Sequence, residues 1–267
     1  MATDDQGAFI WYELMTSDAK SAKAFYDSVV GWNIDAQAAS ALPIDYRMIK
    51  RSDGKFAGGV LTLSKDMADH GAQPGWFGYV HVPSVDAAVE HMVGAGGKVH
   101  LPARDMDGVG RMAMVSDPQG AVLYLMTPTP PASDPNAKSD VFSYTEAEHV
   151  RWNELSTADP KAAAALYAEL LGWRQEGSMP MGPMGDYLFL HHGDGMIGAV
   201  MQKTPDAPCS AWGYYIGVDD IDRAAKAVQA GGGKLLGELQ EIPGGEFSVK
   251  CRDPQGADFG LVGPRAG

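Results

Sequence analysis

The sequence predicts an α+β protein in which one domain of about 120 residues occurs twice in tandem. The first observation is an internal repeat: residues 11–32 recur as residues 152–173, 141 positions later, with 11 of 22 positions identical. The second is a shorter repeat towards the end of each half, where Asp-Pro-Gln-Gly-Ala stands at 117–121 and again at 253–257. A repeating unit of this length is a whole domain, so the chain is predicted to be two copies of one domain.

The first module of each half is predicted to contain a strand, a helix and further strands. Residues 9–15 form the expected opening strand. Asp18 is expected to cap a helix with apolar residues at helical spacing, and Gly31 to end it. The second copy adds Pro160 at the first helical position, where a missing N–H costs little. Further strands are expected at 46–51 and 56–63.

The second module follows the same βαβββ plan. A strand is expected at 76–82, then a helix that starts near Val85 and stops at Gly96-Gly97. Two more strands flank the Asp-Pro-Gln-Gly turn, where Pro presets φ and Gly accepts a positive φ. The equivalent elements occur 136 residues later. The whole chain therefore contains four βαβββ modules.

Composition limits the classes of function. Hydrophobic residues make up 45% of the chain, charged residues 21%, and the net charge is −13. Nucleic acids and anionic membranes require clustered Lys and Arg, so we expect neither as a partner. Cys209 and Cys251 are too few for a disulfide scaffold, and residues 1–7 lack the features of a secretory signal. These observations predict a cytoplasmic protein with reduced thiols.

Paired βαβββ modules of this length resemble the vicinal oxygen chelate superfamily, which includes glyoxalase I, extradiol dioxygenases, and the bleomycin and fosfomycin resistance proteins. The resemblance covers residues 8–128 and 147–264, with a Pro-rich linker at 129–146. It rests on the Asp18…Tyr26…Trp32 pattern and the Asp-Pro-Gln-Gly turn, each with its second copy. The Trp-x-Glu-Leu opening is similar to a bacterial two-domain, glyoxalase-like group.

The resemblance implies tandem glyoxalase-like domains, each a curved mixed sheet of about eight strands with helices on the convex side. The concave cup of each sheet is the expected binding site. The two halves of one chain would then take the place of the two subunits of a homodimer elsewhere in the superfamily. It is expected to be a monomer with pseudo-twofold domains or a weak homodimer.

The superfamily's enzymes hold a divalent metal with His and Glu side chains in the cup. By the resemblance, these positions correspond here to residues that are poor ligands for such a metal: Trp11 and Trp152, Phe77 and Gly213, and Tyr124 and Gly260. We therefore expect no family-type metal site and no cofactor.

Glu13 and Glu154 are the candidate catalytic residues. Each lies two positions after the first ligand position, so its side chain is expected to point into the same cup. Burial of a carboxylate favours a role as a general acid or base. The alternative is structural, with the repeated Glu accepting hydrogen bonds from the backbone or a tyrosine.

Aromatic residues and one histidine are the candidate ligand-binding residues. His81 has Gly217 as its repeat partner, and an imidazole near pH 7 can shuttle protons or bind metal. The aromatic residues could form a pocket for a planar ligand or simply fill the core. They are Trp11, Tyr46, Trp76, Tyr79 and Tyr124 in the first half, and Trp152, Tyr187, Trp212 and Tyr215 in the second.

Three functions are consistent with these residues. The first is metal-independent binding, with or without turnover, of a small aromatic or apolar molecule, as in the bleomycin resistance proteins. The second is a metal-dependent lyase, isomerase or dioxygenase of the glyoxalase type, with His81 as the first ligand to consider. The third is a structural or interaction role with filled cups. The sequence alone leaves open whether the chain is an enzyme.

Overall fold

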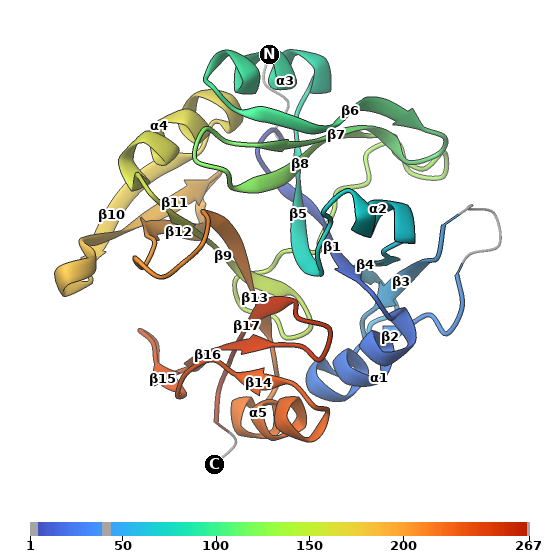
Figure 1. Cartoon of the computed structure of the whole chain (residues 1–267), viewed down its shortest axis with the longest axis vertical. Coiled ribbons are helices and arrows are strands. Elements are labelled where there is room, and N and C mark those ends of the chain that lie inside the picture. The colour runs from blue at the N-terminus through green and yellow to red at the C-terminus, as the bar shows by residue number, and fades with distance from the viewer. Residues whose placement is uncertain (1–4, 39–43, 266–267) are drawn as a thin grey trace. The chain divides into compact units, whose positions relative to one another are not determined.

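The computed structural model describes residues 5–38 and 44–265. Residues 1–4, which belong to the N-terminal segment considered above, lie outside the described residues, as do 39–43 and 266–267. No helix among the described residues is long and apolar enough to cross a membrane. The predicted α+β fold of tandem βαβββ domains is confirmed (Figure 1).

Each half of the chain folds into two βαβββ modules, with short additional elements. The first module contains β1 (Phe9–Thr16), α1 (Ala19–Val30), β2 (Asn33–Ile34), β3 (Tyr46–Lys50) and β4 (Phe56–Thr62), followed by the short helix α2 (Lys65–Asp69). The second contains β5 (Gly75–His81), α3 (Val85–Gly94), β6 (Lys98–Met106), β7 (Gly110–Ser116) and β8 (Val122–Pro128).

The second half repeats this order. The third module contains β9 (Val150–Thr157), α4 (Pro160–Leu171), β10 (Arg174–Pro180), the 3-10 turn η1 (Gly182–Met184), β11 (Asp186–His192) and β12 (Gly195–Gln202). The fourth contains β13 (Ala211–Gly217), α5 (Ile221–Ala230), β14 (Lys234–Leu235), β15 (Gln240–Glu241), β16 (Phe247–Arg252) and β17 (Asp258–Gly263).

The strands form two mixed sheets. The first has eight strands in the order β2-β3-β4-β1-β5-β8-β7-β6. The second has nine, in the order β10-β11-β12-β9-β13-β17-β16-β14, with β15 paired to β16. Within each module the first and last strands are parallel, as in the pairs β1 with β4 and β9 with β12. The helix that follows the first strand returns the chain so that the next strand runs in the same direction. The remaining pairs within the modules are antiparallel.

The predicted helix signals are present at both ends of α1 and α4. The Asp18 carboxylate accepts hydrogen bonds from the Lys20 and Ser21 N–H groups, and Asp159 caps α4 in the same way through Ala162 N–H. Gly31 and Gly172 end the helices with φ values of 96° and 73°, a left-handed conformation that glycine adopts without strain. These local signals explain why the two helices start and stop where the repeat predicts.

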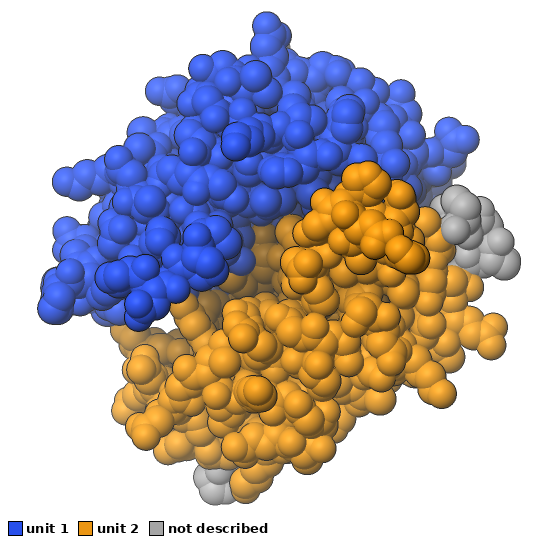
Figure 2. Space-filling model, in the orientation of Figure 1, with its two compact units in different colours: residues 1–10, 78–140, 152–212 blue, residues 11–77, 141–151, 213–267 orange. Residues whose placement is uncertain are grey.

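The described residues group into two compact units, each combining modules from different halves (Figure 2). Unit 1 contains residues 1–10, 78–140 and 152–212, so it joins the second module to the third. Unit 2 contains residues 11–77, 141–151 and 213–267, and joins the first module to the fourth. Helix α3 packs against α4 in unit 1, and α1 against α5 in unit 2. The predicted division at 8–128 and 147–264 stays a prediction, because these units group the modules differently.

Candidate functional site

Strand β9 places Trp152 and Glu154 on one face of the second sheet. The alternate residues Asn153 and Leu155 are almost fully buried, and the Asn153 amide donates to the Ile197 carbonyl at 2.7 Å. Since successive strand side chains point to opposite faces, Trp152 and Glu154 share the other face. Ala199 of β12 pairs directly with Glu154, so its side chain lies on this face as well.

Trp152, Tyr187 and Glu154 form a hydrogen-bonded chain in unit 1. The Trp152 indole Nε1–H donates to the Tyr187 hydroxyl at 2.7 Å, and that hydroxyl donates to Glu154 Oε2 at 2.7 Å. Glu154 is 6% exposed, whereas both aromatic rings are half-buried. A hydrogen bond of this length fixes the orientation of the Glu154 side chain.

Phe189 completes an aromatic cluster beside this chain. The rings of Trp152 and Tyr187 are nearly parallel, with centroids 6.4 Å apart and an interplanar angle of 10°. The Phe189 ring meets both edge-on, at 6.4 Å from Trp152 and 6.0 Å from Tyr187. Three aromatic rings around one buried carboxylate are typical of a site for a planar molecule with a polar group.

The first half contains a similar arrangement in unit 2. The Trp11 indole donates to the Tyr46 hydroxyl at 2.8 Å, and Glu13 is 3% exposed. The Tyr46 ring lies over Gly59, where any Cβ would overlap it. Met48 stands where the second half has Phe189, since Met48 pairs with Gly59 and Phe189 pairs with Ala199. No ring stands at the Phe189 position in this half, and the third ring beside Trp11 is instead Phe56 of β4, with centroids 6.3 Å apart and an interplanar angle of 59°.

Tyr79, Tyr124 and His81 lie together in unit 1. Tyr79 and Tyr124 are paired across β5 and β8, and their rings stack at 4.0 Å with an angle of 7°. They are 4% and 5% exposed, so each ring covers most of the other. His81 pairs with Met126, and its Nδ1 atom is buried without a hydrogen-bond partner among the described residues.

The fourth module differs at both equivalent positions. Tyr215 lies over Gly260, which replaces Tyr124, and a Cβ at Gly260 would overlap the Tyr215 ring. Gly217 replaces His81, and a Cβ there would lie 2.5 Å from the Arg151 side chain. Arg151 is held by Glu246 through bonds of 2.9 and 2.8 Å. The two halves thus keep the same backbone but present different side chains.

Of the two alternatives for Trp76 and Trp212, a pocket wall or core packing, the structure shows core packing, since these residues are 6% and 8% exposed. The Trp76 indole donates to the buried Tyr26 hydroxyl at 2.9 Å, and the Trp212 indole donates to the Tyr167 hydroxyl at 3.4 Å. Tyr26 and Tyr167 lie on helices α1 and α4, so both indoles face the helices. Alternation along β5 and β13 places them opposite the face that holds Tyr79 and Tyr215.

These tyrosines belong to a buried network that the sequence analysis missed. The Tyr26 hydroxyl donates to Asp253 Oδ2 at 3.1 Å, and the Tyr167 hydroxyl donates to Asp117 Oδ2 at 3.1 Å. Each bond joins a helix of one half to the Asp-Pro-Gln-Gly turn of the other half. Burial raises the pKa of both carboxyls and keeps the pKa of Tyr26 well above its usual value. The repeated motifs could have indicated a structural role, because all their members recur.

A sequence model of the Glyoxalase/Bleomycin resistance protein/Dioxygenase superfamily matches residues 8–125 and 147–261. The chain belongs to this superfamily. Among its relatives, "Putative glyoxylase CFP32" of Mycobacterium tuberculosis is 33% identical over 97% of this chain and 95% of its own length. The anthracycline biosynthesis protein DnrV of Streptomyces peucetius is 26% identical over 98% of this chain and 94% of its own length.

Solved structures of the superfamily share the fold at low sequence identity. The Mn(II)-bound glyoxalase from Novosphingobium aromaticivorans has a TM-score of 0.63 and 15% identity, covering 98% of this chain and 83% of that one. The 2,2',3-trihydroxybiphenyl 1,2-dioxygenase from Sphingomonas wittichii has a TM-score of 0.64 and 15% identity, covering 96% and 90%. These structures confirm the predicted fold, and the sequence model confirms the predicted superfamily.

The superfamily's metal does not fit the residues at the expected ligand positions. The Trp11 and Trp152 indoles each donate a hydrogen bond to a tyrosine and have no lone pair for a metal. Tyr124 is stacked face to face on Tyr79. In the described ranges, no three His, Cys, Asp or Glu side chains gather as a metal site.

Proposed function

We propose that this protein binds a planar aromatic small molecule without a metal ion, at the aromatic cluster of unit 1. The observation that carries the proposal is the chain from Trp152 through Tyr187 to Glu154, which occupies the position of the first metal ligand. The half-buried rings supply apolar contact area, and the buried carboxylate supplies one directional acceptor.

Glu154 would recognise a hydroxyl group of the ligand. A carboxylate has about four acceptor positions, and the Tyr187 hydroxyl uses one of them. A ligand phenol can donate to another, and a carboxylate that is already oriented accepts this proton without reorganisation. In any turnover Glu154 would act as the base, and Tyr187 would hold it in place.

The relatives support an aromatic ligand. Two proteins named for anthracycline biosynthesis, DnrV and DauV, align with 98% and 96% of this chain. An anthracycline contains fused planar rings with hydroxyl groups, which are the two features that the cluster of Trp152, Tyr187, Phe189 and Glu154 would select. We therefore propose a hydroxylated polycyclic aromatic compound as the ligand class.

Binding of 1,4-dihydroxyanthraquinone, followed by quenching of tryptophan fluorescence, tests the proposal. Tyr187→Phe removes the hydroxyl that orients Glu154, so the Kd should rise about tenfold, the loss of roughly 1.4 kcal/mol. Tyr46→Phe is the matched control, because it removes the equivalent hydroxyl of the first half. The Kd of that variant should stay within about twofold of the parent value.

Elemental analysis of protein purified without chelators completes the test. Binding should persist, with unchanged Kd, after chelator treatment and in protein that contains no stoichiometric metal. Loss of binding on chelation, restored by Mn(II) or Fe(II), would contradict the proposal and favour the metal-dependent lyase, isomerase or dioxygenase. Equal effects of Tyr187→Phe and Tyr46→Phe would contradict the choice of site.

A further inference from the structure

Arg47 fills a defined position beside helix α1 in unit 2. Its guanidinium forms two bonds of 2.9 Å to the Asp45 carboxylate and donates to the Ala36 carbonyl at 3.0 Å. Thr62 donates to the same carboxylate at 2.9 Å. The Arg47 side chain is only 12% exposed, and the carboxylate holds the pKa of the guanidinium above its ordinary value. A paired, fork-shaped contact of this kind is specific for a guanidinium.

Leu188 takes the equivalent position in the third module. Arg47 pairs with Val60 on β4, and Leu188 pairs with Val200 on β12. Val60 and Val200 in turn pair with Leu14 and Leu155, which are repeat partners at the centre of β1 and β9. The register of both sheets therefore places the two side chains at the same point of the fold. In the second half the guanidinium is missing.

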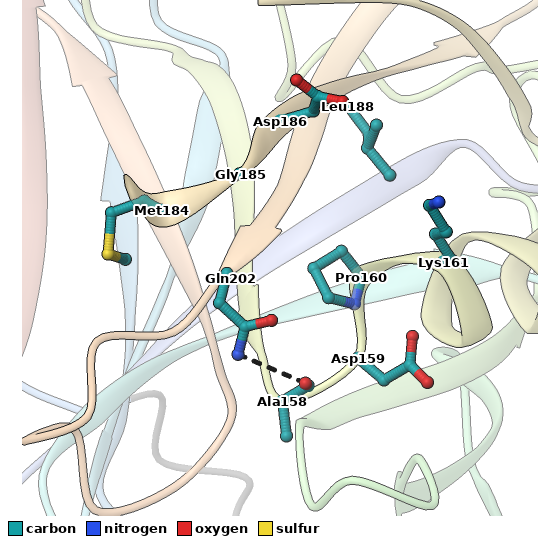
Figure 3. Close-up of a pocket in the computed structure, with 9 residues that line it drawn as sticks. All are labelled: Ala158, Asp159, Pro160, Lys161, Met184, Gly185, Asp186, Leu188 and Gln202. Atoms are coloured by element: carbon teal, nitrogen blue, oxygen red, sulfur yellow. Dashed lines mark hydrogen bonds between the residues drawn. The ribbon is translucent and has the colours of Figure 1, made fainter. Parts of the chain in front are cut away.

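A pocket of about 360 Å³ lies at this point (Figure 3). Its walls come from the start of α4, the segment that leads into β11, and the end of β12. In the close-up, Leu188 and Asp186 lie opposite Pro160 and Lys161. The lining residues are Ala158, Asp159, Pro160, Lys161, Met184, Gly185, Asp186, Leu188 and Gln202.

The charges around the two positions differ by one. In unit 2, Asp18 and Asp45 act electrostatically on Arg47, and Lys20 acts on Asp18, which gives two negative and two positive charges. Their partners in the pocket are Asp159, Asp186 and Lys161, with Leu188 in the fourth position, so one positive charge is lacking. Asp186 has no ion-pair partner within the described residues 5–38 and 44–265.

We propose that this pocket binds a small guanidinium compound, whose guanidinium takes the place that Arg47 occupies in the other half. Asp186 would accept the paired bonds that Asp45 accepts from Arg47. The alkyl part of the ligand would lie against Leu188, Met184 and Pro160. Lys161 does not oppose this arrangement, because its repeat partner Lys20 coexists with Arg47.

An anion is the less suitable occupant, although the pocket adjoins the N-terminus of α4. The carboxylate of Asp159 already accepts the Ala162 N–H at 3.0 Å and places its own negative charge at the helix start. With Asp186 on the opposite wall, the pocket is net negative at neutral pH. Electrostatic complementarity therefore favours a monocation.

Titration calorimetry with n-butylguanidinium tests the proposal, with n-butylurea as the neutral analogue of the same shape. The parent protein should bind the cation and not the urea. Leu188→Arg supplies the pocket with its own guanidinium and should abolish binding. Asp186→Asn, which keeps the shape, should raise the Kd roughly tenfold or more, the usual result when a charged partner is lost.

Arg47→Leu is the reciprocal variant, because it copies the third module into the first. It should create a second site and raise the stoichiometry from one cation per chain to two. A capped Gly-Arg-Gly peptide distinguishes the source of the guanidinium. Equal binding of n-butylurea, unchanged binding to Leu188→Arg, or binding of the peptide alone would each overturn the proposal.

Discussion

Asp117 and Asp253 are buried carboxyls, each held by several hydrogen bonds. Each is 2–3% exposed and accepts two backbone N–H bonds of 2.9 Å as well as a tyrosine hydroxyl. Removal from water disfavours the ionised form by more than these bonds favour it, so the pKa of both carboxyls lies above the ordinary 3.8. The carboxyls thus bind a proton more readily in the folded than in the unfolded chain.

This shift predicts a pH dependence of stability with a defined sign. A raised folded pKa contributes stability that is fully present below about pH 3.8, and it is lost as pH rises through the folded pKa. Asp117→Asn does not titrate. The free energy of unfolding of the parent minus that of Asp117→Asn should therefore fall between pH 4 and pH 7 in urea denaturation.

Asp18→Asn is the control of opposite sign. Asp18 is exposed, and its hydrogen bonds to Ser21 lower the pKa of its carboxyl. A lowered folded pKa contributes stability at neutral pH that is lost as pH falls through it. The free energy of unfolding of the parent minus that of Asp18→Asn should therefore rise from acidic to neutral pH. Parallel slopes for the two variants would contradict the assignment.

At the scale of the element, helices α1 and α4 differ at their first residue. The second copy has Pro160 there, whereas the first has Ala19. The Asp18 side chain caps the N–H groups of Lys20 and Ser21 and leaves that of Ala19 unused. Asp18 has φ −148° and ψ 93°, close to the −138° and 91° of Asp159, which precedes proline.

Ala19→Pro should therefore stabilise the protein. Proline at this position restricts the unfolded chain without breaking a native hydrogen bond, which is worth about 0.4–1 kcal/mol. Denaturation in urea should show a higher midpoint with an unchanged slope. Ala22→Pro, one turn further on, should destabilise the protein, because it removes the Ala22 N–H bond to the Asp18 carbonyl. A lower midpoint for Ala19→Pro would show that the repeat is not a guide to this position.

The elements were predictable where local signals recur. Local residues mark where these elements begin and end: Asp18 and Gly31 cap a helix, and the Asp-Pro-Gln-Gly sequences form turns. Because each of these signals occurs twice, β1, α1 and the hairpins could be predicted directly. The short elements α2, β2, β14 and β15 were not predicted, because ranges of two to five residues show no hydrophobic period.

The site was predictable only in part, because strand alternation assigns a face but not a partner. It placed Glu154 and Trp152 together, and the bond from Tyr187 to Glu154 agrees with the structural alternative considered for this carboxylate. Strand alternation could not show that Trp76 faces a helix. It also could not show that a pocket lies beside Leu188 at the point where, in the first half, the Arg47 side chain lies. Those outcomes depend on contacts between residues far apart in the chain.

At the scale of the whole molecule, each compact unit is built from both halves of the sequence. In unit 2, the Trp32 indole donates to the Glu148 carbonyl at 2.8 Å, and Tyr26 donates to Asp253. In unit 1, Trp173 donates to the Gly7 carbonyl at 2.7 Å. Three aromatic residues that the repeat copies, Tyr26, Trp32 and Trp173, thus join first-half modules to second-half modules.

Separate expression of residues 1–146 and 147–267 tests this dependence. Each fragment alone leaves its helix tyrosine without the aspartate of the other half, and a buried polar group without its partner costs about 1–3 kcal/mol. Neither fragment should unfold cooperatively as a monomer.

The first fragment should instead form a homodimer in which Tyr26 of one copy bonds Asp117 of the other, because the two turns are equivalent. Mixing equal amounts should give a heterodimer with a Tm close to that of the intact chain, measured by calorimetry and light scattering. The Asp117→Asn change should weaken the homodimer, which would lose both of its tyrosine–aspartate bonds, more than the heterodimer, which would lose the Tyr167 bond and keep the bond from Tyr26 to Asp253. A stable, monomeric first fragment would show that the halves, and not the units, are the independent folding domains.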